Sequence, residues 1–155
     1  MSGFGIKRRV LGVDYGQARI GIAVSDELGM LAHPVETISA AGGNPVARIA
    51  EIAREKNVSC VVVGVPRHMN GAVGVSAGEA LAFAEKLRRA LQCPVITQDE
   101  RLSTVAANRA LRSGGQKTRN TRGFIDQVAA QMILQTYLDS LPADPEEGDE
   151  TADEP

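Results

Sequence analysis

The pattern of hydrophobic and polar residues over the first 40 positions of the chain predicts three β-strands, at Ile6–Asp14, Arg19–Ser25 and Leu31–Ile38. The first contains the hydrophobic run Val10–Val13, and the second alternates hydrophobic and other residues with the period of two that is typical of strands. The short connection at residues 14–18 predicts that the first two segments form a hairpin. Pro34 interrupts the third segment, which suits a strand at the edge of a sheet.

Beyond residue 40 the hydrophobic period changes to the spacing of a helix. Asn44 is a good N-cap and Pro45 a good first helical residue, and the hydrophobic positions that follow predict a helix ending near Asn57. Ser59–Val65 is then an almost uninterrupted hydrophobic run, as expected for a strand that is covered on both faces.

The rest of the chain continues the alternation of helix and strand. The predicted elements are a helix begun by a capping box at Ser76–Glu79, a short strand at Pro94–Thr97, a helix capped by Ser103 and stopped by Gly114-Gly115, a basic loop at Lys117–Arg122, and a last helix at Ile125–Leu138.

The predicted order of elements is therefore βββαβαβαα. Three antiparallel strands followed by strand–helix crossovers give an α/β fold, a mixed five-stranded sheet with helices on both faces. The ribonuclease H-like architecture has this order, whereas a doubly wound parallel sheet does not begin with three antiparallel strands. We predict a single ribonuclease H-like domain over residues 1–141.

Length and composition agree with one soluble domain. The chain has 155 residues, of which 43% are hydrophobic and 23% charged, and these values exclude collagen, a coiled coil and a wholly disordered chain. No hydrophobic run approaches the roughly 20 residues of a membrane span, and the N-terminus lacks a signal-peptide stretch. We expect a cytoplasmic protein with no membrane partner, in which Cys60 and Cys93 are reduced.

Charge is distributed unevenly along the chain. Seven of the 19 acidic residues lie within residues 142–155, where there is no basic residue, so this segment reads as an acidic disordered tail. Residues 1–141 keep 17 basic and 12 acidic residues, a net charge of +5. This mildly basic body permits a polyanionic partner without proving one.

Three carboxylates come from separate elements that can meet on one face of the fold. Asp14 ends the first strand, Glu100 follows the last strand, and Asp126 falls in the first turn of the predicted last helix. Carboxylates that converge repel one another, and a cation relieves the repulsion. Oxygen ligands favour Mg²⁺ or Mn²⁺, and two such ions can activate a water and stabilise the leaving oxygen of a phosphodiester.

Each of these acids also has a purely structural interpretation. Asp126 would stabilise the dipole at the start of a helix, Glu100 could form a surface pair with Arg101, and Asp14 could bind its own turn. The spacing of the residues leaves both interpretations open.

Four segments together resemble the YqgF/RuvX family, and they are VLGVDYGQARIGIAVSD, VVVGVPRHMNG, DERLST and IDQVAAQMILQTYLD. They follow one another in order from about residue 9 to 139. The last two make the match specific, because actin-like and sugar-kinase ATPases begin with a similar hairpin. Proteins of the family are described as Holliday junction resolvases and, more recently, as nucleases that mature the 5′ end of pre-16S rRNA.

The resemblance implies that Asp14, Glu100 and Asp126 form a catalytic, metal-binding triad. Two departures from the family pattern concern the grip on the substrate. Met69–Ala72 reads MNGA where MDGS is usual, and Ser113–Arg122 is less basic than the corresponding loop of the family. The triad itself is intact.

Basic residues adjoin the proposed site in a fold of this kind. We expect them to form a rim that contacts phosphates, and the alternative is a scatter of solvated surface charges. They are Arg19, Arg67, Arg101, Lys117, Arg119 and Arg122.

These observations predict a nuclease of the two-metal-ion type that uses Mg²⁺ or Mn²⁺ and matures the 5′ end of pre-16S rRNA in ribosome biogenesis. Holliday junction resolution in DNA recombination and repair stays open, as does a non-catalytic nucleic-acid-binding factor with the same fold. An actin-like ATPase is disfavoured because that fold needs two such domains. The oligomeric state is also open, a homodimer included.

Overall fold

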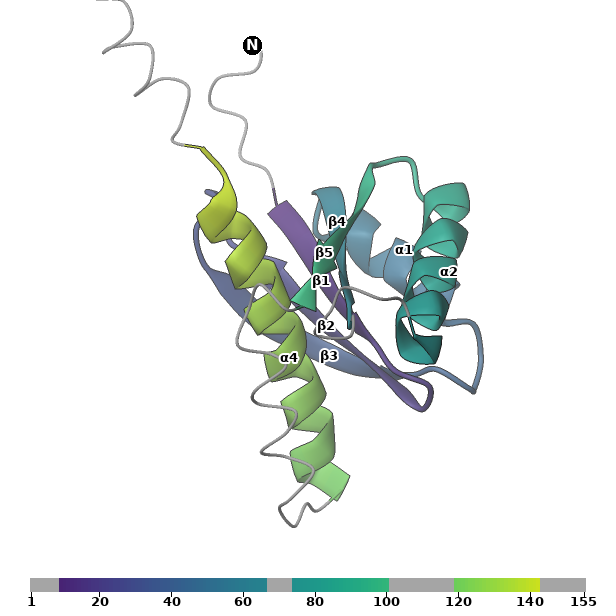
Figure 1. Ribbon diagram of the computed structural model, residues 1–155. Coiled ribbons are helices and arrows are strands. Elements are labelled where there is room, and N and C mark those ends of the chain that lie inside the picture. Colours follow the sequence, from purple (N-terminus) through teal and green to yellow (C-terminus); the bar gives the residue numbers. More distant parts are fainter. Residues whose placement is uncertain (1–8, 67–73, 101–118, 143–155) are drawn as a thin grey trace, which may run out of the picture.

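One mixed sheet of five strands forms the centre of the structure (Figure 1). The computed structural model describes residues 9–66, 74–100 and 119–142, with the backbone alone at 119–123. The elements in chain order are β1 Arg9–Tyr15, β2 Arg19–Ser25, β3 Ala32–Ser39, α1 Pro45–Glu55, β4 Val58–Val65, α2 Val75–Ala90, β5 Val95–Asp99 and α4 Arg119–Ser140.

The strands lie side by side in the order β3-β2-β1-β4-β5. β2 is antiparallel to both of its neighbours, whereas β4 is parallel to β1 and to β5. The sequence prediction of a ribonuclease H-like mixed sheet is thereby confirmed. The first half of this topology follows from two short connections, one between β1 and β2 and one between β2 and β3, because strands joined in this way pair antiparallel.

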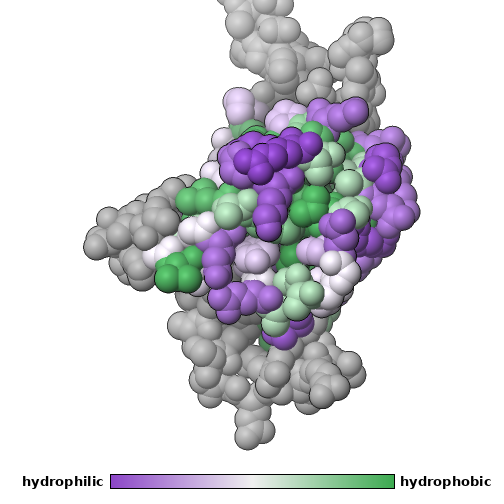
Figure 2. All heavy atoms as spheres, turned by 90° about the vertical axis from the view of Figure 1, so that its right-hand side faces the viewer, coloured by the Kyte–Doolittle hydropathy of each residue, from purple (hydrophilic) through white to green (hydrophobic). Residues whose placement is uncertain are grey.

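Helices cover the two faces of the sheet unequally. α1 and α2 pack on one face over a cluster that includes Leu11, Ile22 and Val63. On the other face, α4 is the one helix within the described residues, and it crosses β1, β2 and β3 (Figure 1). Hydrophilic side chains are spread over the outer side of the molecule to the right in Figure 1, with hydrophobic ones between them (Figure 2). Within the described residues, no helix is both long enough and hydrophobic enough to cross a membrane.

Three glycines of the sheet allow α4 to lie against the strands. Gly12, Gly21 and Gly64 are on the α4 face of β1, β2 and β4. A Cβ atom at Gly21 would lie 1.9 Å from the backbone oxygen of Asp126, and one at Gly12 would lie 2.8 Å from Cβ of Leu134. Both distances are below any real contact, so the absence of side chains sets the depth at which α4 sits.

Two boundaries differ from the sequence prediction. α4 begins at Arg119 rather than at Ile125, so Arg119–Arg122 is helical and the predicted basic loop at Lys117–Arg122 is wrong over most of its length. Asp126 is therefore in the third turn of the helix, too far from its start to serve the helix dipole. α2 begins at Val75 with Gly74 as its N-cap and no side-chain cap, so the capping box at Ser76–Glu79 is also wrong.

Several predictions fall on residues outside the described part of the chain. They are the helix from Ser103 to Gly114 and the acidic tail, apart from its first residue, and both stay predictions. Cys60 and Cys93 are described, and both are free and partly buried. Burial raises the pKa of both thiols, which keeps them protonated and poorly nucleophilic, as suits structural cysteines.

The seating of α4 gives a test of the packing. Gly21→Ala should lower the free energy of unfolding by about 1–3 kcal/mol, because its methyl group overlaps the backbone of α4. Gly78→Ala is the matched control: it lies inside α2 with open space around it, and it should raise that free energy by about 0.5–1 kcal/mol. Urea unfolding of both variants measures the two changes, and equal effects would contradict the proposed packing.

Candidate active site

Asp14 is a buried acid on the α4 face of the sheet. Its side chain is only 3% exposed, and it points to the same side of β1 as Gly12 because side chains alternate along a strand. Gly21 of β2 is its partner across the antiparallel pair. On the other side, Val13 pairs with Val63 of β4, so Gly64 is the next residue along that strand. Asp14 therefore has a glycine beside it on each neighbouring strand.

Glu100 reaches the same patch from the edge strand. It follows β5 directly, and its side chain is 2% exposed. A Cβ atom at Gly64 would lie 2.9 Å from its Oε2 atom, which places this carboxylate above the glycine next to Asp14. The parallel pairing of β4 with β5 carries Glu100 to this position, since Val65 pairs with Asp99.

Asp126 comes to the opposite side of Asp14 on α4. Its backbone oxygen lies directly over Gly21, the residue that pairs with Asp14. Its side chain is 14% exposed, and its Oδ2 atom accepts a hydrogen bond of 2.6 Å from Nε of Arg19 on β2. The guanidinium supplies a positive charge against the carboxylate, and charge-assisted bonds of this length are the strong ones.

The three predicted acids thus lie around one patch of the sheet, with Asp14 between the residues seated over Gly21 and Gly64. Carboxylate oxygens suit Mg²⁺ or Mn²⁺, so the chemistry of the donors fits such an ion. Within the described residues, however, no group of three or more His, Cys, Asp or Glu side chains is arranged so that it could hold a metal ion. One oxygen of Asp126 is committed to Arg19. The shared metal site stays a prediction.

Of the six basic residues predicted to contact phosphates, the structure describes the side chain of Arg19 alone. Arg19 is 42% exposed and is bound to Asp126, a pairing that the sequence analysis did not foresee. Arg119 and Arg122 lie in the first turn of α4, where only the backbone is described. Arg67, Arg101 and Lys117 lie outside the described residues, as do both departures at Met69–Ala72 and, except for residues 119–122, at Ser113–Arg122.

Two residues that the sequence analysis passed over hold the turn between β1 and β2. The side-chain amide of Gln17 donates to Oε1 and Oε2 of Glu79 on α2, at 3.1 and 3.0 Å. The ring of Tyr15 stacks on that of Phe83, with 4.7 Å between the centroids. These contacts fix a turn that lies directly between Asp14 and Arg19. In the sequence, Glu79 is the residue that could have indicated this contact, but its spacing from Ser76 suggests a capping box instead.

Comparison with known proteins places this site in context. The profile of the RuvX family, described as "Holliday junction resolvase", matches residues 8–140. A protein of Nocardia farcinica named "Putative pre-16S rRNA nuclease" is 49% identical over 143 residues, which cover 87% of this chain and 79% of that protein. A protein of the same name from Bacillus licheniformis is 43% identical over 136 residues, covering 86% of this chain and 98% of that protein.

The fold has a counterpart among solved structures. RuvC of T. thermophilus, solved in complex with a Holliday junction substrate, matches with a TM-score of 0.50 and 16% sequence identity. The match covers 84% of this chain and 94% of RuvC. At this identity the likeness concerns the fold alone, and it agrees with the ribonuclease H-like topology described above.

The ion pair between Arg19 and Asp126 can be tested without any assay of function. A double-mutant cycle of Arg19→Gln and Asp126→Asn should give a coupling energy on the order of 1 kcal/mol, because the acid is largely shielded from water. The same cycle for Arg9 and Glu27, which are 3.3 Å apart with Glu27 67% exposed, should give a coupling close to zero. Indistinguishable values for the two pairs would contradict the short, shielded contact.

Proposed function

This chain belongs to the RuvX family, and on that basis we propose that it is a nuclease that matures the 5′ end of pre-16S rRNA. The family relationship spans the whole described domain. Two curated relatives carry the pre-16S rRNA nuclease name at 43% and 49% identity, which favours that substrate over others.

The observation that carries the proposal is the pair of buried acids. Asp14 and Glu100 are 3% and 2% exposed, on a face of the sheet whose buried residues are mostly hydrophobic, such as Val10 and Val62. Burying two like charges on neighbouring parts of a sheet costs stability, and proteins accept such a cost chiefly at functional sites. Asp126 adds a third carboxylate from the opposite side of Asp14.

We propose that Asp14, Glu100 and Asp126 would hold Mg²⁺ or Mn²⁺. Such ions, when bound, supply an activated water and stabilise the leaving oxygen of a phosphodiester. The fit rests on donor chemistry, because all three side chains offer only carboxylate oxygens. Burial of Asp14 and Glu100 fixes their positions, and the glycines beneath Asp126 and Glu100 allow both to come close to the sheet.

Arg19 would hold and orient Asp126 and supply positive charge beside the acids. Its Nε atom donates to Asp126, which leaves the remaining nitrogen atoms of the guanidinium for an incoming phosphate. We propose that Arg67, Arg101, Lys117, Arg119 and Arg122 contact further phosphates, since basic side chains do most of the positioning of nucleic acids.

Resolution of a Holliday junction is the second candidate. It is favoured by the description of the family and by the fold shared with RuvC, which was solved with such a junction. A non-catalytic binding factor would keep the same fold and bind RNA without cutting it. One set of variants separates these three functions.

Asp14→Asn should reduce Mn²⁺-dependent cleavage of a pre-16S leader RNA by about a hundredfold or more, comparable to the loss of a catalytic group. Asp126→Asn should do the same while RNA binding stays equal or becomes tighter, because the variant removes a negative charge facing a polyanion. Asp139→Asn is the matched control, since Asp139 is an exposed acid near the far end of α4. Gel assays of cleavage and of binding measure both effects.

Three results would each contradict a part of this proposal. Preferential cleavage of a four-way DNA junction over the leader RNA would assign the junction function instead. Tight RNA binding by the wild type without any cleavage in Mg²⁺ or Mn²⁺ would indicate a binding factor. Full activity of Asp14→Asn would overturn the proposed site.

A further inference from the structure

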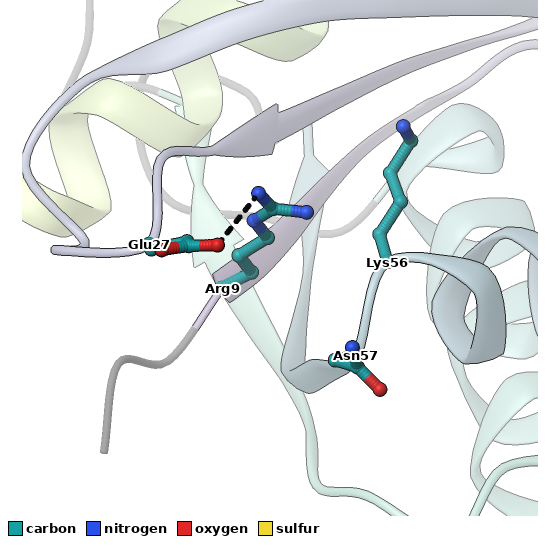
Figure 3. Close-up of a pocket in the computed structure, with 4 residues that line it drawn as sticks. All are labelled: Arg9, Glu27, Lys56 and Asn57. Atoms are coloured by element: carbon teal, nitrogen blue, oxygen red, sulfur yellow. Dashed lines mark hydrogen bonds and ion pairs between the residues drawn. The ribbon is translucent and has the colours of Figure 1, made fainter. Parts of the chain in front are cut away.

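A polar pocket lies at the end of the sheet opposite to the three acids. It has a volume of about 210 Å³, several times the roughly 30 Å³ that one water occupies in the liquid. Arg9 at the start of β1, Glu27 in the turn after β2, and Lys56 and Asn57 after α1 line it (Figure 3). In that view Glu27 lies on one side of the Arg9 guanidinium and Lys56 on the other.

The guanidinium of Arg9 is only partly satisfied. Its Nη2 atom lies 3.3 Å from Oε2 of Glu27, a long contact to a side chain that is 67% exposed. Its Nε atom is buried and has no hydrogen-bond partner, and it is the one such side-chain atom within the described residues. A buried donor without a partner costs stability and points to a missing acceptor.

Positive charge exceeds negative charge around this pocket. Arg9 and Lys56 face one acid, Glu27. Glu36 also lies near enough to Lys56 to interact with it, but the Arg48 guanidinium holds Glu36 through two bonds of 2.9 and 2.7 Å. Those bonds, with a smaller effect of Lys56, lower the pKa of Glu36 and keep it ionised. The excess of basic over acidic side chains among the residues that line the pocket favours the binding of an anion.

The backbone around the pocket is held in place. The hydroxyl of Ser59 donates to the carbonyl of Arg9 at 3.3 Å, and the backbone nitrogen of Val10 donates to Ser25 at 2.9 Å. Lys56 is the C-cap of α1, and Asn57 follows in the left-handed region with φ 55°, which turns the chain into β4. The positions of both cations are thus set by strand and helix ends rather than by a long loop.

We propose that this pocket binds a phosphate group, namely a backbone phosphate of the nucleic acid that the protein cleaves, and the proposal in this form rests on the proposed function. A phosphate oxygen would satisfy Nε of Arg9 while a second oxygen contacts Nη2, the two-point geometry that a guanidinium prefers. Lys56 adds a point charge, and the phosphate displaces the loosely held Glu27.

The distance between the two sites suits a long substrate. Arg9 and Asp14 are five residues apart on one strand, which corresponds to about 17 Å. A nucleic acid held at both ends of β1 would be bound away from the point of cleavage as well as at it. The pocket would then add affinity without taking part in the reaction.

Binding of a pre-16S leader RNA without divalent metal tests this inference. Lys56→Gln and Arg9→Gln should each weaken binding and reduce the slope of log affinity against log salt by about one unit, because each removes one phosphate contact. Arg89→Gln is the matched control, since Arg89 is an exposed base in the last turn of α2 that is not among the residues lining the pocket. Lys56 lies at the end of a helix near the surface, so Lys56→Gln should leave the fold intact. Its binding therefore tests the pocket even if Arg9→Gln disturbs β1.

Titration with inorganic phosphate distinguishes the source of the group. The Nε–H signal of Arg9 in an NMR spectrum should shift saturably in the wild type and much less in Lys56→Gln. If inorganic phosphate shifted the Arg9 signal but the variants left the salt slope of RNA binding unchanged, the pocket would be assigned to free phosphate and the proposal overturned. The absence of both effects would also overturn it. These binding measurements do not depend on cleavage. If the protein cleaved no RNA but the two variants still reduced the salt slope, only the proposed nuclease function would be overturned.

Discussion

The close contact between α4 and the sheet is the constraint on which the candidate site depends. Gly21 has no side chain at the point where the backbone oxygen of Asp126 lies, and Gly12 and Gly64 leave room for the residues of α4 farther along. A methyl group at Gly21 or Gly12 would meet backbone atoms of α4 and push the helix away, whereas one at Gly64 would meet the side chains of Ile133 and Glu100. The same contact that packs α4 therefore brings Asp126 beside the patch that holds Asp14 and Glu100. The close approach of α4 to these glycines therefore determines both how the helix packs and where Asp126 lies.

Electrostatics works against this arrangement and must be offset locally. Asp14 and Glu100 are almost fully shielded from water, and a third carboxylate approaches them on α4. Arg19 provides one positive charge by pairing with Asp126. Like charges gathered in a place of low dielectric favour the binding of cations, so in the proposed site the energetic cost in the free protein would become affinity for a divalent ion. The opposite end of β1 shows the reverse balance, with Arg9 and Lys56 facing a single exposed acid.

Much of this fold could be predicted from the sequence because its signals are local. The alternation in β2, Asn44 with Pro45, and the hydrophobic run at β4 mark these elements in the sequence, and the antiparallel placing of β2 was predicted correctly. The order of the strands within the sheet was not predicted, because it depends on contacts between residues far apart in the chain. The start of α4 was missed because residues 119–124 are mostly polar and include Gly123, so no hydrophobic period marks them. The sequence could single out the three acids because each stands at or near the end of a predicted element, and their joint role as a metal site stays a prediction. The contact of Arg19 with Asp126 could not be foreseen, since 107 positions separate the two residues.

The central claim is that packing of α4 onto the glycines assembles one ion site from three elements. A crystal structure of the protein soaked in Mn²⁺, with the ion located by its anomalous scattering, tests this most directly. The account predicts manganese bound by carboxylate oxygens of Asp14, Glu100 and Asp126 together. An ion held by only one of these residues, or sites elsewhere on the surface with this patch unchanged, would contradict it.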